Sequence, residues 1–445
     1  MKVLHDLKKL SLAFSITVAA LLAADDSNLG TDRNVSDSNA SLLFDAQQMS
    51  VEAQAKSGTS LDDYLSELKR KQFGYEYEKA DQESSKLRDS WIQPVVLSYS
   101  INRSNPYNED GKGESESQNA AIAIDQPIFQ SGGIIYGIKF ANASREYANY
   151  SIDQQKRIMI KQAVDLLMQI KQSELSIAKQ QLQIANAEIN LEQKREQYLN
   201  GQLDSGFLNN AILEKNIAVQ ALYDLETGNA QLIAQFKKIS DLDPKRAKIP
   251  FLALLDEAKF LEQNIDLRLA ESESEKNRYN KNVTLAKYLP SVNLLASYNW
   301  QKQDSYLSPG FKNTSETDYY RYGLKASMPL DINSYNDFEA AKVEYLKSQV
   351  VIDDKKRELK LLYEQVMQNL LKYDKKIALA DENRNLYEVL LDETRGLFKA
   401  GYKTQYDVDT LVNSLQIEGI NKKIYEIDKQ LELLSLYEKV SNDLQ

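Results

Sequence analysis

The stretch "LFKAGYKTQYDVDTL" (residues 397–411) has a glycine, Gly401, at the end of a long run with no proline and one other glycine, Gly396. The stretch "YLNGQLDSGFLNNAIL" (residues 198–213) has Gly201 in the matching place. From residue 139 to residue 200 there is neither glycine nor proline, which predicts one α-helix of roughly 90 Å at about 1.5 Å per residue. The two glycines therefore predict that two very long helices end and turn back at the same register.

An internal repeat relates the two halves of the chain. The segment "SIDQQKR" (residues 151–157) resembles "VIDDKKR" (residues 351–357). The same offset pairs Ile170 with Leu370, Ile177 with Ile377, Leu191 with Leu391, Arg195 with Arg395, Tyr198 with Phe398, and Gly201 with Gly401. Upstream, "QPVVLSYSIN" (residues 93–102) resembles "LPSVNLLASYN" (residues 289–299). An ordered series in both halves predicts a duplication, with a first structural repeat at residues 61–245 and a second at residues 246–445.

Each half predicts the same elements in the same order. A helical segment (Leu61–Ser90; Leu252–Lys287) precedes two strands, one very long helix, the glycine turn and a shorter helix (Asp204–Ile239; Thr404–Val440). We expect the shorter helix of one half to stack end to end on the pre-strand helix of the other. Two apolar stripes repeat every seven residues on nearly opposite sides of the first long helix: Ile170, Ile177, Ile184, Leu191 and Tyr198, and Met168, Leu175, Leu182 and Ile189. Two stripes favour a helix in a curved wall; an extended soluble coiled coil is the alternative, and it leaves the strands unexplained.

Four segments alternate with period two, as strands do. Their apolar positions are Val95, Leu97, Tyr99 and Ile101; Ile122 and Ile124; Val292, Leu294, Ala296, Tyr298 and Trp300; and Tyr320, Tyr322, Leu324, Ala326 and Met328. Each segment is about ten residues long, the length of a tilted strand that crosses a membrane, although an ordinary half-buried sheet gives the same pattern. The polar stretches Ser104–Glu116 and Lys302–Thr317 are expected to be outward-facing loops. Four strands cannot close a barrel in lipid, so several chains would have to share one.

Composition excludes several kinds of chemistry. The chain has 445 residues, no cysteine and a single histidine, His5. Thiol nucleophiles, Cys/His zinc sites and histidine general bases therefore lack their essential residue, and only carboxylate chemistry is left open. The net charge of −10 is unfavourable for binding nucleic acid.

The N-terminus has the pattern of a secretory signal peptide. A basic start precedes an apolar run from Leu10 to Leu22 and small residues at Ala23 and Ala24. We expect residues 1–24 to be removed; a membrane anchor is the alternative, although the run is short for a bilayer span. No cysteine follows, so no N-terminal lipid anchor is expected. Residues 25–60 form a polar segment rich in Ser, Asp and Asn.

The chain resembles the TolC-type outer-membrane efflux protein family over residues 61–437. The duplicated layout carries the resemblance together with a motif around the glycine: Phe398, Gly401, Thr404, Asp407 and Val408. A second marker is "NIDLRLAE" (residues 264–271) leading to "YLPSVNL" (residues 288–294). The resemblance implies a mainly α fold with a small β part: a long α-helical barrel of coiled-coil hairpins and a transmembrane β-barrel of twelve strands, shared by a homotrimer with four strands from each chain.

The resemblance also implies a function and partners. Members are passive exit ducts of tripartite export pumps, in the outer membrane of Gram-negative bacteria, with a large periplasmic part. A periplasmic adaptor (membrane fusion protein) joins the duct to an inner-membrane transporter of the RND, ABC or MFS type. The cargo is small molecules such as drugs, or polypeptides in type I secretion. No catalytic residue, cofactor, metal or nucleic-acid partner is expected, and outer-membrane lipid surrounds the strands. The alternative function is a periplasmic structural or adaptor coiled-coil protein; an enzyme with paired carboxylates is a more distant one.

The family's entrance is closed by helical hairpins near the periplasmic tips, through polar links and an acidic ring. The positions that match in this chain are Phe398 and Lys403 for the links, Asp407 for the ring, and Thr410 for the second ring acid, with Asp409 one residue earlier. The hairpin turns, expected to contact the adaptor, are Gly201 with Asp204 and Gly401 with Thr404. In the first repeat the motif acid falls on Phe207, so we expect the gate at the second turn. An acid after a helix start is also explained by the helix dipole alone, and Lys403 by simple solvation.

Overall fold

A computed structural model describes residues 61–104, 113–308 and 311–440. Every element described below belongs to one compact unit, Lys56–Gln445. The expected signal peptide (residues 1–24) and the polar segment at residues 25–60 lie outside the described residues.

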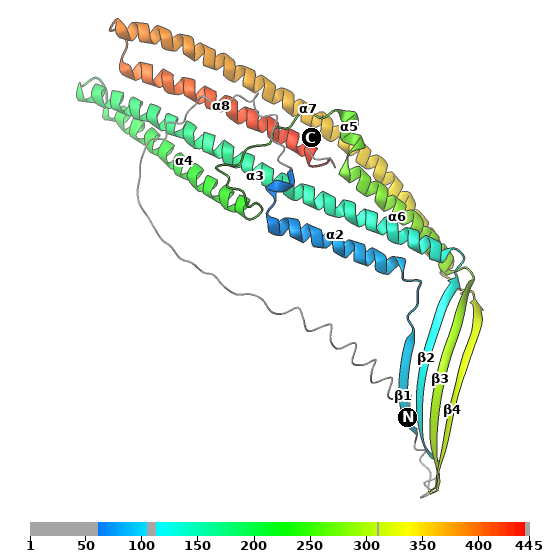
Figure 1. Cartoon of the computed structure of the whole chain (residues 1–445). Coiled ribbons are helices and arrows are strands. Elements are labelled where there is room, and N and C mark those ends of the chain that lie inside the picture. Colours follow the sequence, from blue (N-terminus) through cyan, green and yellow to red (C-terminus); the bar gives the residue numbers. More distant parts are fainter. Residues whose placement is uncertain (1–60, 105–112, 309–310, 441–445) are drawn as a thin grey trace. The chain divides into compact units, whose positions relative to one another are not determined.

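Two similar series of elements follow one another along the chain (Figure 1). The first series is η2 (Leu61–Tyr64), α2 (Glu67–Arg88), β1 (Val96–Ser104), β2 (Glu114–Phe129), α3 (Gly133–Leu199) and α4 (Ser205–Lys237). The second is α5 (Glu257–Glu262), α6 (Ile265–Lys287), β3 (Ser291–Ser308), β4 (Phe311–Ser327), α7 (Ser334–Lys399) and α8 (Gln405–Tyr437). The predicted fold class, mainly helical with a small β part, is confirmed.

The long helices α3 and α7 are packed with the shorter ones into a layer of four columns. Helix α3 contacts α2 and α4 as well as α6 and α8, and α7 contacts α6 and α8 (Figure 1). The expectation that the first long helix has neighbours on two sides is therefore confirmed. At 67 residues, α3 is about 100 Å long. None of the helices in the described part of the chain is apolar over enough of its length to cross a bilayer.

The shorter helices stack end to end on the pre-strand helices. The backbone N–H of Ser66, which caps α2, donates to the carbonyl of Ile239 after α4 at 2.8 Å, and Ile265 N–H at the start of α6 donates to Lys439 O after α8 at 2.8 Å. Each junction joins the free amides of one helix N-terminus to the carbonyls of another C-terminus. The stacked helices belong to the same half, so the prediction of stacking between halves is wrong. Helix α2 comes before the strands that lead into the start of α3, and α4 follows the end of α3. Both pack against the same side of α3, which places them in one column.

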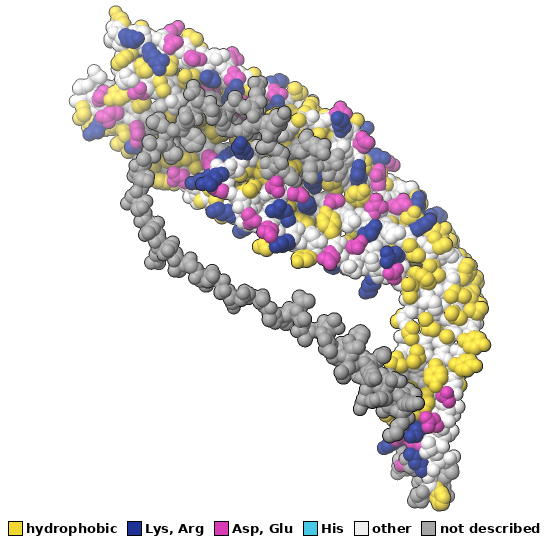
Figure 2. Space-filling model, viewed as in Figure 1, with side chains coloured by type: hydrophobic (Ala, Val, Ile, Leu, Met, Phe, Trp, Pro, Cys, Tyr) yellow, Lys and Arg dark blue, Asp and Glu magenta, His cyan; other side chains and the backbone are white. Residues whose placement is uncertain are grey.

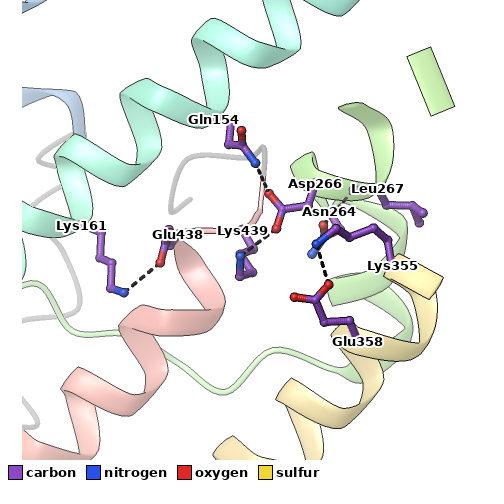
Figure 3. A network of polar contacts seen from close by, with 9 residues as sticks. All are labelled: Gln154, Lys161, Asn264, Asp266, Leu267, Lys355, Glu358, Glu438 and Lys439. Atoms are coloured by element: carbon purple, nitrogen blue, oxygen red, sulfur yellow. Dashed lines mark hydrogen bonds and ion pairs between the residues drawn. The ribbon is translucent and has the colours of Figure 1, made fainter. Parts of the chain in front are cut away.

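A polar network holds the junction between α8 and α6 (Figure 3). Asn264 is fully buried and caps α6, with its Oδ1 accepting from Leu267 N at 3.1 Å. Asp266 accepts from Gln154 Nε2 of α3 and from Lys439 Nζ, each at 2.7 Å. The helical segment predicted at Leu252–Lys287 is two helices, α5 and α6, and begins only at Glu257; Asn264 starts the second of them as its N-cap.

The apolar core lies where the columns are joined. Its fully buried side chains include Leu65, Leu167, Met168, Ile170, Phe236, Leu252, Phe260, Leu359, Val366 and Leu436. They come from the middle of α3 and of α7, from the ends of the helices stacked beside them, and from the connecting segments at Leu65 and Leu252. Packing therefore fixes the middle of the helical layer and leaves the hairpin tips with few buried residues.

The strands form one antiparallel sheet in the order β1-β2-β3-β4. The register aligns Leu97 with Ile122, Ile122 with Tyr298, and Tyr298 with Tyr320. Because side chains alternate along each strand, this register puts the predicted apolar residues of all four strands on one face. Figure 2 shows hydrophobic side chains gathered over the strands, whereas charged side chains are spread over the helices. The opposite face has mainly hydroxyl and amide side chains, with a few apolar residues such as Ala121, Ala123 and Leu295.

Three of the strands are longer than predicted. Strand β1 has 9 residues, but β2, β3 and β4 have 16, 18 and 17. The residues from Lys302 to Thr317, predicted as a loop, are strand in their described part, and Glu114–Glu116 begin β2. These residues are polar on both faces, so they lack the alternation that identifies a strand in sequence; pairing with the neighbouring strands keeps them extended.

Candidate gate at the tips of the helical hairpins

Both hairpin tips are closed by the same backbone turn. At the second tip, Gly401 has φ +79°, its N–H donates to Phe398 O at 3.0 Å, and Tyr402 N–H donates to Leu397 O at 2.9 Å. At the first tip Gly201 has φ +68°, with the matching bonds from Gly201 N–H to Tyr198 O and from Gln202 N–H to Gln197 O. This paired pattern is a Schellman motif, which needs a left-handed residue after the helix, and glycine adopts that conformation without strain. The glycines thus end α3 and α7 as predicted.

Thr404 and Asp407 form a reciprocal cap at the start of α8. Thr404 N–H and Thr404 Oγ1 each donate to Asp407 Oδ2 at 2.9 Å, and Asp407 N–H donates to Thr404 Oγ1 at 3.3 Å. Lys403 Nζ lies 3.7 Å from Asp407 Oδ1. The backbone hydrogen bond from Thr404, followed by the Thr404 hydroxyl and the charge of Lys403, lowers the pKa of Asp407. Asp407 is therefore a carboxylate with a structural role in each chain, whatever else it does.

The first tip is capped differently. Asp204 precedes α4 and its Oδ1 accepts from Gly206 N–H at 2.7 Å. Phe207 takes the place of the second-tip acid and is more than half exposed. The first tip therefore presents an aromatic ring where the second presents a capped carboxylate, and the two tips are chemically unequal as the sequence predicts.

The remaining candidate residues lie close to the second turn without forming one cluster. Phe398 and Tyr402 are exposed, by 40% and 80%. Asp409 accepts from Gln405 Nε2 at 2.7 Å, and Thr410 Oγ1 donates to Tyr406 O in its own helix at 2.8 Å. Within a single chain, only Lys403 and Asp407 of the predicted link and ring residues contact each other.

Two side-chain contacts that the sequence does not predict join the hairpins. Tyr406 Oη of α8 donates to Glu196 Oε1 of α3 at 3.2 Å, and Asn413 Nδ2 donates to Asn186 Oδ1 at 2.8 Å. Burial and the bond to Glu196 raise the pKa of Tyr406. The partners are more than two hundred residues apart, so no local pattern indicates them.

Toward the tips, ion pairs join the two helices of one hairpin, whereas Lys161 of α3 and Glu438 at the end of α8 pair between the hairpins at the far end, at 2.9 Å. Lys422 and Lys429 of α8 contact Asp381 and Asp374 of α7 at 2.9 and 2.6 Å, and Lys215 of α4 contacts Glu188 of α3 at 2.9 Å. Near the tips, the hydrogen bond between Asn413 and Asn186 joins two neutral groups, and the bond between Tyr406 and Glu196 has one charged partner. A hydroxyl or amide bond contributes about 1 kcal/mol, so the seam between hairpins is weakly held there.

The described residues offer no site for metal chemistry: no cluster of three or more His, Asp or Glu side chains among them could hold an ion. The tips have three other surface features: two turns closed by glycine, the capped carboxylate of Asp407, and isolated hydrogen bonds between α3 and α8. Such an arrangement suits contact with another protein or a change of spacing between hairpins.

Comparisons with known proteins agree with the fold. The family model "Outer membrane efflux protein" matches residues 258–416, which include β3, β4, α7 and the second tip. No match was found among curated proteins. The expected resemblance to TolC-type outer-membrane efflux proteins is thus confirmed by the family match over that part of the chain and by the fold.

Several solved structures share the fold. The outer membrane protein VceC of Vibrio cholerae aligns with a TM-score of 0.65 at 12% identity, over 86% of this chain and 96% of its own. The CmeC outer membrane channel of Campylobacter jejuni gives 0.64 at 12% identity, over 93% and 94%. The open state of the MtrE outer membrane channel of Neisseria gonorrhoeae gives 0.58 at 13% identity, over 85% and 87%. At these identities the likeness shows the fold.

Proposed function

We propose that the chain is the outer-membrane exit duct of a tripartite export pump, a passive channel that carries small molecules or polypeptides out of the cell. The observation that carries the proposal is the sheet: in the part nearer the helices, the apolar residues of its four strands lie together on one face, and most polar residues lie on the other. This is the pattern of strands that face lipid outside and water inside. CmeC and MtrE, which share the fold, are described as outer membrane channels.

The sheet edges support assembly of several chains. Strands β1 and β4 each pair on one side with a strand of this chain, so each leaves one edge open. An open edge in lipid leaves unpaired amides and carbonyls, each costing several kcal/mol. Pairing β4 of one chain with β1 of the next removes both edges. Three copies give twelve strands, the number that the family resemblance implies.

The helices carry matching seams. One stripe of α7 is apolar and exposed along its length: Val343, Leu346, Val350, Leu361, Leu371, Leu379, Leu386 and Val389. Across the layer, α2 and α4 expose Leu68, Tyr75, Leu213 and Ile217. A monomer seldom exposes apolar surface of this extent, which marks an interface. The seams lie on the outer columns of the four-column layer, where a neighbouring chain would close the wall.

The hairpin tips are the entrance in this proposal. The long helices, about 100 Å each, would cross the periplasm and bring the tips to the adaptor and, through it, to the inner-membrane transporter. The turns at Gly201 and Gly401, with Asp204 and Thr404, would contact the adaptor. Asp407 of three chains would form an acidic ring, with Asp409, Lys403, Phe398 and Thr410 beside it. The duct holds no energy source of its own, so export would be driven by the transporter.

Fractionation followed by bilayer recording tests the proposal. We expect the protein in the outer-membrane fraction, as an assembly whose electrophoretic mobility changes on heating, and we expect the purified assembly to give discrete conductance steps in planar bilayers. Recovery of a soluble periplasmic monomer would instead favour the structural or adaptor coiled coil.

A further inference from the structure

The polar face of the sheet is almost free of charge over most of its length. Three successive rows run across the four strands: Ser100, Asn119, Gln301 and Thr317; Asn102, Ser117, Gln303 and Ser315; and Ser104, Ser115, Ser305 and Asn313. All are hydroxyl or amide side chains. On the described strands, this face has three charged residues, Asp125, Arg321 and Lys325, and all three lie at the end of the sheet that leads into α3 and α7.

Within the described ranges, the two cations on this face have no carboxylate partner. Asp125 accepts from Asn293 Nδ2 at 2.6 Å. The guanidinium of Arg321 lies 5.6 Å from the ring centre of Tyr319, its neighbour on the same face. Among the described residues, neither Arg321 nor Lys325 forms an ion pair. Their positive charge is thus left to act on the space in front of the sheet.

On the apolar side of the sheet, two cations form ion pairs. Beyond the aromatic residues, Arg103 Nη2 contacts Glu116 Oε2 at 2.7 Å, and Lys312 Nζ contacts Asp304 Oδ2 at 2.8 Å. Both cations are therefore neutralised locally. On the face that would meet lipid head groups, two of the three described strand cations are thus paired, Lys302 being the third; on the face that would meet the lumen, neither described cation is.

Spacing makes the two cations one electrostatic feature. Arg321 and Lys325 are four residues apart on β4, or about 13 Å at about 3.3 Å per residue. That is close to one Debye length of about 10 Å at 0.1 M salt, so their potentials overlap in a narrow pore. Around three chains, six cations would face three carboxylates.

We propose that Arg321 and Lys325 form a basic ring at the inner end of the β part, and that this ring draws anions into it. The ring rests on the proposed function, because it needs the polar face to line a shared lumen. A low-dielectric wall with one sign of charge concentrates the opposite ion. The cargo class it favours carries carboxylate or phosphate groups. The uncharged rows beyond it bind neither sign strongly, so an anion that passes the ring is released outward.

Charge-removal variants test the ring in planar bilayers under a potassium chloride gradient. The double variant Arg321→Gln with Lys325→Gln should raise the potassium-to-chloride permeability ratio about two- to fivefold. The matched control is Lys302→Gln, which removes one lysine from the opposite face of β3 and should leave the ratio unchanged. Equal ratios in wild type and double variant would overturn the ring, while wild-type channels that conduct would still support the duct.

Two further measurements keep the outcomes separate. If the double variant does not assemble, each single variant is recorded, and an unchanged ratio in both overturns the proposal. Pyrophosphate added to wild-type channels should reduce the current at lower concentration than an equal ionic strength of chloride, and no difference between the salts contradicts the ring. A wild-type protein that gives no conductance at all refutes the proposed duct rather than the ring.

Discussion

The capped acid at the second tip can be separated into two roles by three substitutions. Asp407 accepts the Thr404 backbone N–H at 2.9 Å and also supplies a negative charge. Thr404→Ala removes the cap and keeps the charge. Asp407→Asn removes the charge and keeps a side-chain oxygen that can accept the bond. Asp407→Ala removes the charge and the acceptor for the Thr404 N–H, and leaves the Thr404 hydroxyl as acceptor for the N–H of residue 407.

The expected magnitudes follow from the contacts. Loss of the Thr404 hydroxyl, the N-cap acceptor, costs about 1 kcal/mol, so Thr404→Ala should lower protection of the amides at residues 404–408 by about fivefold in hydrogen exchange. Asp407→Ala loses the bond from the Thr404 N–H, also about 1 kcal/mol, and should have an effect of similar size. Asp407→Asn loses the charge–dipole interaction alone, about 0.3–1 kcal/mol for an exposed site. The first tip, capped by Asp204, is the internal control and should not change.

Ion selectivity should group these three variants in a different way from amide protection. If three copies of Asp407 line the opening, Asp407→Asn and Asp407→Ala both reduce the cation preference in bilayer recordings, whereas Thr404→Ala does not. A Thr404→Ala channel with the selectivity of Asp407→Asn would refute the separation of roles. Unchanged selectivity in both Asp407 variants would remove this acid from the pore and leave it as a cap.

The pH dependence of the cap has a definite sign. Because hydrogen bonds from Thr404 lower the pKa of Asp407 in the folded tip, the ionised carboxylate stabilises the folded form. That contribution is complete above the ordinary aspartate pKa of about 3.9 and is lost as the pH falls through the lowered value. The difference in tip protection between wild type and Asp407→Asn should therefore be constant near neutral pH and disappear in acid.

Three other predictions concern the turn, the seam and the hairpin link. Gly401→Ala should destabilise the second tip by about 1–2 kcal/mol by hydrogen exchange, purely through its left-handed backbone, since an added Cβ meets nothing within 4 Å; Gly396→Ala, inside α7 with equal space, should not. Leu379→Glu with Leu386→Glu should lower the trimer fraction more than tenfold in light scattering, because the carboxylates would be buried between chains. Arg384→Glu, exposed and on the side of α7 away from this stripe, is the control, and equal loss in it would argue against the seam. Tyr406→Phe removes the hydrogen bond to Glu196, about 1 kcal/mol in each chain, and should raise the mean bilayer conductance. Tyr402→Phe, on the exposed turn, is the control and should not change it. A Tyr406→Phe channel with wild-type conductance would remove Tyr406 from gating.

Local sequence patterns predicted most helices, strands and turns. The full strand lengths, the helix junctions and the links between hairpins depend on long-range contacts and could not be predicted. Gly201 and Gly401 marked the turns because only a left-handed residue closes a Schellman motif. Apolar alternation located the strands but ended near Trp300, where the strand continues with polar side chains held by pairing. The junction of α8 with α6 depends on the bond from Ile265 N–H to Lys439 O, between residues far apart in the chain. The Tyr406–Glu196 link was missed for the same reason.

The mass of the assembly extracted from outer membranes tests the central claim most directly. Native mass spectrometry in detergent should give a particle of three mature chains, because three four-stranded sheets and three pairs of helical seams close on one another. A stable, membrane-inserted particle of one chain would contradict the account, since four strands with two open edges could not then be the part that crosses the membrane.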